Sequence, residues 1–199
     1  MKKIGIIGEH FHNDACAFAA LMTPQYKDVV QFVPILKSLK GGYGSARKIT
    51  AMLPTEMLKN KLDAVICTHD LDNDRNWAFL DKWYKEINAS IKQKGILYVA
   101  VMELEALILA DIEPFNELYK VQIKYPKNPK FETDPKQYLM ERTYKTKRKY
   151  DENHAEEIFK RLRFDVVYKR HTGEHSFKEF IKAFNSRFDF EDPSVFVKF

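Results

Sequence analysis

The first 111 residues alternate short apolar runs with stretches of helical periodicity, and this alternation constrains the fold more than any other feature. Four apolar runs predict strands, at residues 4–7, 29–36, 63–68 and 96–102. The stretches that follow them predict helices, at residues 13–22, 46–53, 77–93 and 104–110. Strands that alternate with helices form a mainly parallel sheet with helices on both faces. The sequence therefore predicts an α/β fold.

Local signals refine three of these elements. Pro34 lies inside the second predicted strand and favours an edge position, because proline cannot donate a hydrogen bond to a neighbouring strand. Gly95 follows the predicted 77–93 helix and is expected to close it. That helix carries apolar residues at helical spacing, which predict a face packed in the core: Trp77, Leu80, Trp83, Tyr84, Ile87 and Ile91.

Residues 112–199 follow a different pattern, which predicts a helical, basic extension. Four prolines punctuate residues 112–135 and predict a loop-rich stretch. The elements predicted after it are a helix that starts at Pro135 behind the cap Asp134, a helix at 152–162, a strand at 164–168, and a helix at 177–184 behind the cap Ser176. We expect this extension to pack on a core of residues 1–111 as one structural unit.

Acidic residues lie directly after three of the predicted strands. They are Glu9 after the first strand, Asp70 and Asp72 after the third, and Glu103 and Glu105 after the fourth. Ligands of α/β sheets bind beyond the carboxyl ends of the strands, and carboxylates placed there suit Mg²⁺ or Mn²⁺. The alternative for the aspartates is a structural role, in which Asp72 or Asp74 caps the following helix.

The expected roles of these acids follow from their spacing. Residues two apart on a strand share a face, so Asp70 and Asp72 are the first-choice metal ligands. Glu9 is expected to be a further ligand or the general base that activates water. Glu103 and Glu105 share a face only if the strand persists that far. If both reach the site, two metal ions about 3.5–4 Å apart become feasible, an arrangement suited to phosphodiester cleavage.

Positive charge is concentrated in the middle of the chain. The net charge of +5 comes from residues 120–170, which hold 15 basic and 8 acidic side chains. Lysines and arginines interleaved with tyrosines are typical of a segment that binds nucleic acid. The residues that we assign to this role are Lys136, Lys145, Lys147, Arg148, Lys149 and Arg170. The alternative is a solvated lysine-rich surface on a tyrosine-stapled pair of helices.

Two further patterns have both functional and structural interpretations. The glycine-rich residues 41–45 precede a helix and suit either phosphate binding or an ordinary turn, and the turn is favoured because the Walker A lysine spacing is missing. His10, His12 and His69 flank the acids and suit either a transition metal or neighbouring polar roles. Their spacing matches no zinc pattern, which favours the polar roles.

The remaining composition bears on cellular location. Cys16 and Cys67 lie in apolar contexts, which favour two buried thiols over a disulfide. No apolar run approaches the roughly 20 residues that span a bilayer, and the charges of Lys2 and Lys3 lead straight into a short strand, unlike a signal peptide. We expect a cytoplasmic protein with no membrane partner.

A glutamate after the first strand and an Asp-x-Asp after the third resemble the signature of the Toprim fold. Glu9 matches the first element, and Asp70 and Asp72 match the second. The chain is most similar to compact, stand-alone Toprim-like nucleases of the overcoming-lysogenisation-defect type. The segments that carry this resemblance are residues 101–111, Pro135-Lys136 and Ser176-Phe177. The chain differs from the Toprim pattern at His10, where glycine is usual, and at Asn73-Asp74-Arg75, where a glycine usually lies downstream of the aspartates.

The resemblance implies a Mg²⁺- or Mn²⁺-dependent nuclease that acts on DNA or RNA, in a setting of phage defence and with an ATPase as a partner protein. The alternative is a non-catalytic Toprim-like module that binds nucleic acid or the ATPase. A receiver-like phosphoacceptor domain is disfavoured, because such domains have paired acids after the first strand and a lysine after the fifth. The choice between DNA and RNA and the oligomeric state stay open.

Overall fold

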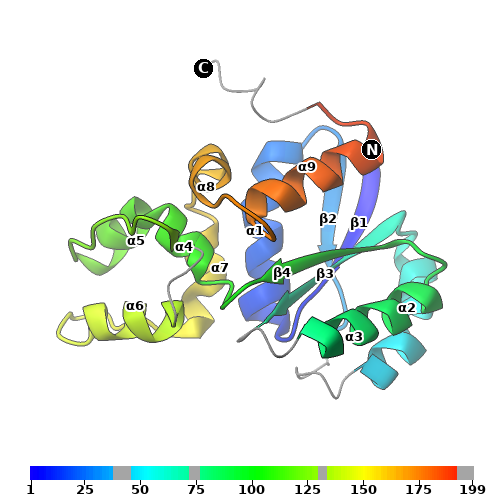
Figure 1. Cartoon of the computed structure of the whole chain (residues 1–199), viewed down its shortest axis with the longest axis horizontal. Coiled ribbons are helices and arrows are strands. Elements are labelled where there is room, and N and C mark those ends of the chain that lie inside the picture. The colour runs from blue at the N-terminus through cyan, green and yellow to red at the C-terminus, as the bar shows by residue number, and fades with distance from the viewer. Residues whose placement is uncertain (38–45, 72–76, 130–133, 192–199) are drawn as a thin grey trace.

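The computed structural model describes residues 1–37, 46–71, 77–129 and 134–191 of the chain (Figure 1). Asp72 and the glycine-rich residues 41–45, to which roles were assigned above, lie outside the described residues. None of the helices in the described part has the length and apolar character needed to cross a bilayer.

The chain has an α/β fold built on a four-stranded sheet in which all neighbouring strands are parallel. Its strands are β1 (Lys2–Ile7), β2 (Val30–Pro34), β3 (Ala64–Asp70) and β4 (Gly95–Ala100), in the order β2-β1-β3-β4. Pro34 ends β2, which is an edge strand as predicted. The chain runs from β1 outward to β2 and then crosses to β3 on the other side of β1. This reversal makes the crevice between β1 and β3 the expected ligand site of the sheet.

Helices cover both faces of the sheet, as predicted (Figure 1). One face carries α1 (Ala17–Tyr26) and α9 (Phe177–Phe188), and the other carries α2 (Ala46–Asn60) and α3 (Trp77–Ser90). Each face has its own hydrophobic cluster, and strand residues alternate between the two clusters. Both faces of the strands are therefore buried, which explains why they read as continuous apolar runs in the sequence.

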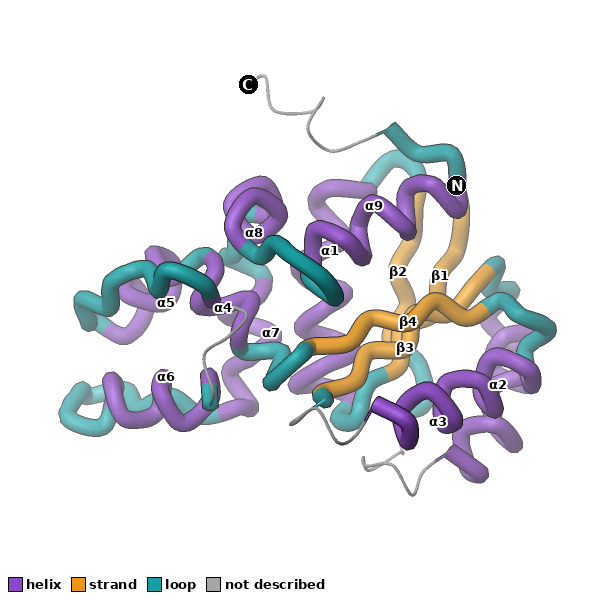
Figure 2. Tube along the Cα trace, viewed as in Figure 1, coloured by secondary structure: helices purple, strands orange, loops and turns teal. Residues whose placement is uncertain are grey.

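The remaining helices gather beyond the carboxyl ends of β3 and β4, as Figure 2 shows. They are α4 (Ala106–Ala110), α5 (Ile112–Tyr119), α6 (Pro135–Thr143), α7 (Ala155–Phe159, preceded by a 3-10 turn at Glu152–His154) and α8 (Phe164–Arg170). Their apolar residues continue the cluster under α1 and α9, so one core links residues 112–191 to the sheet. Asp134 and Ser176 cap α6 and α9 as predicted, and each accepts a hydrogen bond from the backbone N–H three residues on.

The predicted strand at residues 164–168 is wrong, because this segment forms α8. Phe164, Val167 and Tyr168 are its buried residues, and their spacing is that of one helical face rather than the alternation of a strand. The ring of Phe164 packs against Phe177 of α9, with centroids 5.4 Å apart. A five-residue segment rich in apolar side chains can form either a strand or a helix, and packing against α9 favours the helix here.

Some predicted helix ends are also wrong. The first helix begins with a π-helical turn at Phe11–Cys16 and continues through Pro24 to Tyr26, four residues beyond its predicted end. The second passes through Pro54 to Asn60 rather than stopping at residue 53. Gly95 does not close α3; it begins β4, while Lys92 and Gln93 take the left-handed backbone conformation after the helix. In each case burial against the sheet outweighs the local sequence signal.

Candidate metal centre

Two of the predicted site residues lie at the crevice between β1 and β3. Ile7 and Cys67 are paired in the ladder between these strands, so Glu9 and Asp70 follow the same end of two adjacent parallel strands. Asp70 is the last residue of β3, and Glu9 lies two residues beyond β1. The sheet topology thus brings together two acids that are 61 positions apart in the sequence.

Glu9 is held by His69, a buried residue of β3. The Nδ1 atom of His69 lies 2.7 Å from Oε1 of Glu9 and 2.7 Å from the backbone oxygen of Asp70. Because the backbone oxygen only accepts, Nδ1 carries the proton and donates. Burial alone raises the pKa of Glu9, but the hydrogen bond and charge of His69, with the charge of His10, outweigh it and lower that pKa. Glu9 is therefore ionised at neutral pH.

Asp70 is the acid of the site whose ionised form the folded protein disfavours most. Its Oδ1 accepts a hydrogen bond of 3.1 Å from the backbone N–H of Leu104. Burial raises the pKa of Asp70 well above its ordinary value, and four nearby carboxylates raise it further: those of Asp14, Glu105, Glu9 and Glu103. Crowded carboxylates of this kind are relieved by a proton or by a cation.

Asp14 belongs to this group and was not predicted as a site residue. It lies on the π-helical turn after β1, and its Oδ2 accepts a 2.7 Å hydrogen bond from the backbone N–H of His10. Gly8 gives it room, because a Cβ atom at Gly8 would lie 2.4 Å from Cβ of Asp14 and 2.9 Å from Oγ1 of Thr68. Burial raises the pKa of Asp14. Asp14 fell inside the predicted helix at residues 13–22, and a glycine such as Gly8 directly before Glu9 is the one sequence signal consistent with so close an approach.

Glu103 and Glu105 do not share a strand face, because β4 ends at Ala100. Oε2 of Glu103 accepts a 2.8 Å hydrogen bond from the backbone N–H of Lys136. Oε1 of Glu105 accepts one of 2.9 Å from the hydroxyl of Tyr150. Burial raises the pKa of Glu105 to about 7. Both glutamates are thus held by the extension, while their charges still act on Asp70.

Lys136 brings a positive charge to the same place. Its Nζ lies 3.6 Å from Oε1 of Glu103 and 3.4 Å from Oε2 of Glu152. Burial alone lowers the pKa of Lys136, but the charges of four nearby carboxylates outweigh burial and raise that pKa. These carboxylates belong to Glu105, Glu103, Glu152 and Asp70. This lysine was predicted to bind nucleic acid, and the structure places it against the acids.

The acids suit a hard dication, although they do not form a closed cage. The donor set consists of carboxylate oxygens, which Mg²⁺ and Mn²⁺ prefer, and Mg²⁺ keeps several waters between itself and the protein. Among the described residues, no three of these acids bring oxygen atoms within 4.8 Å of one another. Glu9 and Asp70 follow the two strands that border the crevice, Asp14 is close enough for its charge to act on Asp70, and Asp72 is two residues after Asp70 in the sequence.

The other residues predicted to bind nucleic acid fall into two sets. Lys145, Lys147 and Lys149 are exposed on the link after α6, where the Nζ of Lys149 lies 5.0 Å from the ring centroid of Tyr144. Two arginines have partners within the protein instead. Arg148 pairs with Glu157, while Arg170 donates a 3.1 Å hydrogen bond to the backbone oxygen of Pro126 and lies over the ring of Tyr125. Their role in binding nucleic acid stays a prediction.

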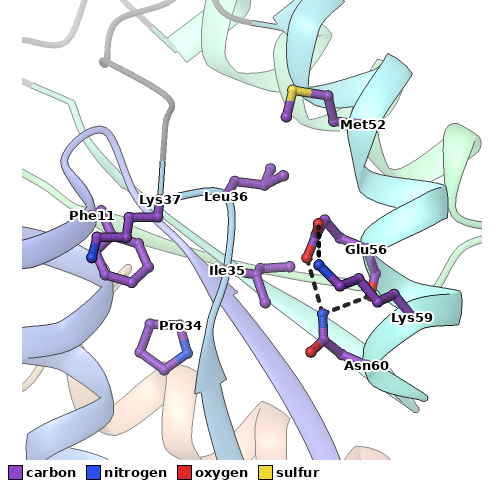
Figure 3. A pocket seen from close by; sticks show the side chains of 9 residues that line it. All are labelled: Phe11, Pro34, Ile35, Leu36, Lys37, Met52, Glu56, Lys59 and Asn60. Carbon is purple, nitrogen blue, oxygen red and sulfur yellow. Dashed lines mark hydrogen bonds and ion pairs between the residues drawn. The ribbon is translucent and has the colours of Figure 1, made fainter.

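A separate surface pocket of about 530 Å³ lies beside the end of β2 (Figure 3). It is lined by apolar side chains such as Ile35 and Met52. The polar groups on its α2 wall are already paired with each other, since the carboxylate of Glu56 accepts a 2.9 Å hydrogen bond from Asn60 and lies 4.0 Å from Nζ of Lys59. Nothing in this pocket adds a ligand to the acid site.

Comparison with known proteins adds no assignment. No protein-family model, no curated protein and no solved structure matches the chain. The resemblance to Toprim proteins therefore stays a prediction that depends on the residues quoted for it.

Proposed function

We propose that the protein is a Mg²⁺- or Mn²⁺-dependent nuclease that cleaves phosphodiester bonds of DNA or RNA. The observation that carries the proposal is the convergence of Glu9, Asp14 and Asp70 at the crevice between β1 and β3, with Glu103 and Glu105 close enough to act on Asp70. This crevice is where parallel sheets bind their ligands. Crowded carboxylates at such a place favour a dication over the metal-free state.

The residues have distinct roles in this proposal. Asp70, Asp14 and the adjacent Asp72 hold the metal ion, directly or through water. Glu9 is a ligand or the general base, and His69 keeps it ionised and fixes its orientation. The bound metal ion supplies a water of lowered pKa and positive charge at the scissile phosphate.

The exposed lysines would hold the nucleic-acid strand. Lys145, Lys147 and Lys149 lie on the link after α6, and Lys136 of the same helix reaches the acids. A positively charged segment that leads to a metal site is suited to a polyanionic substrate, because it attracts the phosphates that the acids alone would repel. A role in phage defence is a part of the proposal that comes from the Toprim resemblance alone, whereas the proposed cytoplasmic location comes from the two cysteines, whose apolar contexts favour free thiols over a disulfide.

The test is metal binding followed by cleavage. Calorimetric titration with Mg²⁺ and with Mn²⁺ compares the wild type with Asp70→Asn, and Asp81→Asn on the exposed face of α3 is the matched control. We expect metal binding in the wild type and the control and its loss in Asp70→Asn, with cleavage of single- or double-stranded DNA or RNA following the same pattern. Metal binding that persists unchanged in a folded Asp70→Asn protein contradicts the proposed site.

A non-catalytic module that binds nucleic acid or a partner ATPase is the second candidate. The observation that favours it is the pairing of Glu103 with Lys136 and of Glu105 with Tyr150, which leaves these glutamates engaged within the protein. For such a module, Asp70→Asn leaves the affinity for nucleic acid or partner unchanged, and no dication is required. For the nuclease, the same substitution abolishes cleavage while the lysines still bind the strand.

A further inference from the structure

A second group of metal-ligating side chains lies outside the carboxylate site. It consists of His12 and Cys16 on the π-helical turn and Glu156 on α7, and one ligand atom from each lies within 4.8 Å of the other two. In the described part of the chain, this is the only group of three such residues that meets this distance. We propose that His12, Cys16 and Glu156 bind a transition-metal dication, with Zn²⁺ as the preferred ion.

The π-helical turn explains how two of the ligands come together. Side chains four residues apart are neighbours on one face of a helical turn. His12 and Cys16 have this spacing within Phe11–Cys16, and they point to the same side of the turn. Single π-helical turns are rare and occur frequently at functional sites. The turn therefore brings together an imidazole and a thiol at a four-residue spacing that pairs of zinc ligands on a helix also have.

The third ligand comes from a distant part of the chain. Glu156 lies in the first turn of α7, which packs against the π-helical turn. A metal ion held by all three residues would join the first helical segment of the sheet domain to the helices beyond the strands. Because the two segments are 140 residues apart in sequence, such a link would stabilise their packing against each other rather than a local loop.

The donor atoms select the metal. An imidazole nitrogen, a thiolate sulfur and a carboxylate oxygen suit Zn²⁺ or Co²⁺, whereas Mg²⁺ prefers oxygen alone. Around a tetrahedral zinc ion the ligand atoms lie about 3.5 Å apart, so modest side-chain rotations bring the three into place. Three protein ligands leave a fourth position for water or an exchangeable ligand. The solvent exposure of His12 keeps that position accessible.

Existing contacts do not prevent metal binding. Cys16 is a free thiol. Oε1 of Glu156 accepts a 2.6 Å hydrogen bond from Nζ of Lys160, a side chain that is 61% exposed. Such surface ion pairs contribute little stability, and the second carboxylate oxygen does not take part in this one. Zn²⁺ would then compete only with a solvated lysine.

Cobalt provides the decisive probe, because Co²⁺ bound to a thiolate shows a sulfur-to-metal charge-transfer band and tetrahedral Co²⁺ shows visible absorption. The untagged full-length protein is titrated with Co²⁺ and then with Zn²⁺. We expect both features at one equivalent of Co²⁺, their loss on addition of Zn²⁺, and no effect of excess Mg²⁺. Absence of the charge-transfer band in the wild type overturns the proposal.

Variants assign the ligands and separate this site from the acids. Cys16→Ser should lose the charge-transfer band, and His12→Gln and Glu156→Gln should lose tight Zn²⁺ binding while remaining folded, because these two side chains lie at or near the surface. Glu157→Gln, the adjacent glutamate that pairs with Arg148, is the matched control and should bind Zn²⁺ as the wild type does. Asp70→Asn should also retain Zn²⁺. Retention of the band in Cys16→Ser, or of full affinity in both other variants, overturns the assignment.

Discussion

Glu9 and His69 are joined by a hydrogen bond across the ends of β1 and β3, with Nδ1 of the histidine 2.7 Å from Oε1 of the glutamate. The imidazole is buried, and its ring packs edge-on against Trp83 of α3, with centroids 4.8 Å apart. Core packing on the α3 side of the sheet therefore fixes the orientation of a carboxylate at the sheet edge. Glu9 is thus oriented and ionised before any ligand binds, as a general base or metal ligand of the proposed site would need to be.

Asp70→Asn should stabilise the metal-free protein at neutral pH. The folded protein raises the pKa of Asp70 by burial and by nearby carboxylates, so the ionised form opposes folding and stability falls as pH rises above the unfolded value. Asparagine removes the charge and keeps an oxygen that can accept from Leu104. We expect a gain of about 1–3 kcal/mol in the free energy of unfolding, measured in urea at pH 7 with a chelator present.

Asp70→Asn should no longer be more stable than the wild type when a metal ion is added. Mg²⁺ should raise the stability of the wild type and leave Asp70→Asn unchanged, because ligands stabilise only a folded state that binds them. A variant that is less stable than the wild type in chelator contradicts the view that crowded charges dominate at this position. Asp81→Asn, on exposed α3, should behave as the wild type in both conditions.

Glu105→Gln should remove part of the pH dependence of stability. The pKa of Glu105 is about 7 in the folded protein and 4.5 ordinarily, because folding favours the protonated carboxyl. The stability that this protonated carboxyl contributes is therefore fully present below pH 4.5 and is lost as pH rises to about 7. Glutamine can still accept from the hydroxyl of Tyr150. As pH rises from 4.5 to 7, we expect the free energy of unfolding of the variant to increase relative to that of the wild type by up to about 3 kcal/mol. Chemical denaturation of the metal-free proteins measures this difference.

The control for this measurement is Glu113→Gln, whose carboxylate is exposed. A difference between wild type and Glu105→Gln that stays constant from pH 4.5 to 8 would show that Glu105 is not the group that titrates. A difference that grows with pH for both variants would mean that the effect is not specific to Glu105.

The sheet and the meeting of Glu9 with Asp70 could be predicted because short-range signals determine them. Apolar runs mark the buried strands, Pro34 marks the edge, and parallel pairing places Glu9 and Asp70 at the same end of adjacent strands. Those features need only the period of a strand and the rules of parallel sheets. The α/β architecture follows from them.

Other parts of the site depend on contacts between distant segments. The directions of Glu103 and Glu105 are set by Lys136 and Tyr150, which lie 33 and 45 residues further along the chain. The place of Asp14 depends on a π-helical turn, which has no simple sequence pattern. Spacing along the sequence therefore shows which acids follow the strands, but it does not show which distant residue forms a hydrogen bond with each of them.

Gly8→Ala should disturb the acid site through Asp14. The new Cβ would lie 2.4 Å from Cβ of Asp14, so the π-helical turn must move. Overpacking of this kind costs about 1–3 kcal/mol, measured as the free energy of unfolding. We also expect weaker Mg²⁺ binding by calorimetry. Asp14→Asn separates the two effects, because it removes the charge without the clash: it should weaken metal binding and leave the metal-free protein at least as stable as the wild type.

The three exposed lysines after α6 should account for much of the salt dependence of nucleic-acid binding. Replacing Lys145, Lys147 and Lys149 with glutamine removes up to three phosphate contacts, each worth about 0.9 in the slope of log K against log salt on duplex DNA and about 0.7 on single strands. We therefore expect the slope to fall by up to about 2–3, with weaker binding at low salt. Fluorescence anisotropy with a labelled oligonucleotide across a range of salt concentrations measures both.

A matched triple variant tests whether position matters or only net charge. Lys27 next to α1, Lys48 on α2 and Lys82 on α3 are all exposed and lie outside the link after α6. Their replacement by glutamine changes the net charge by the same amount, so long-range attraction falls equally in the two variants. If the lysines after α6 contact phosphates, only the first variant loses salt slope. Equal losses in both would mean that the protein attracts nucleic acid through its overall charge, and the link after α6 would not be a binding segment.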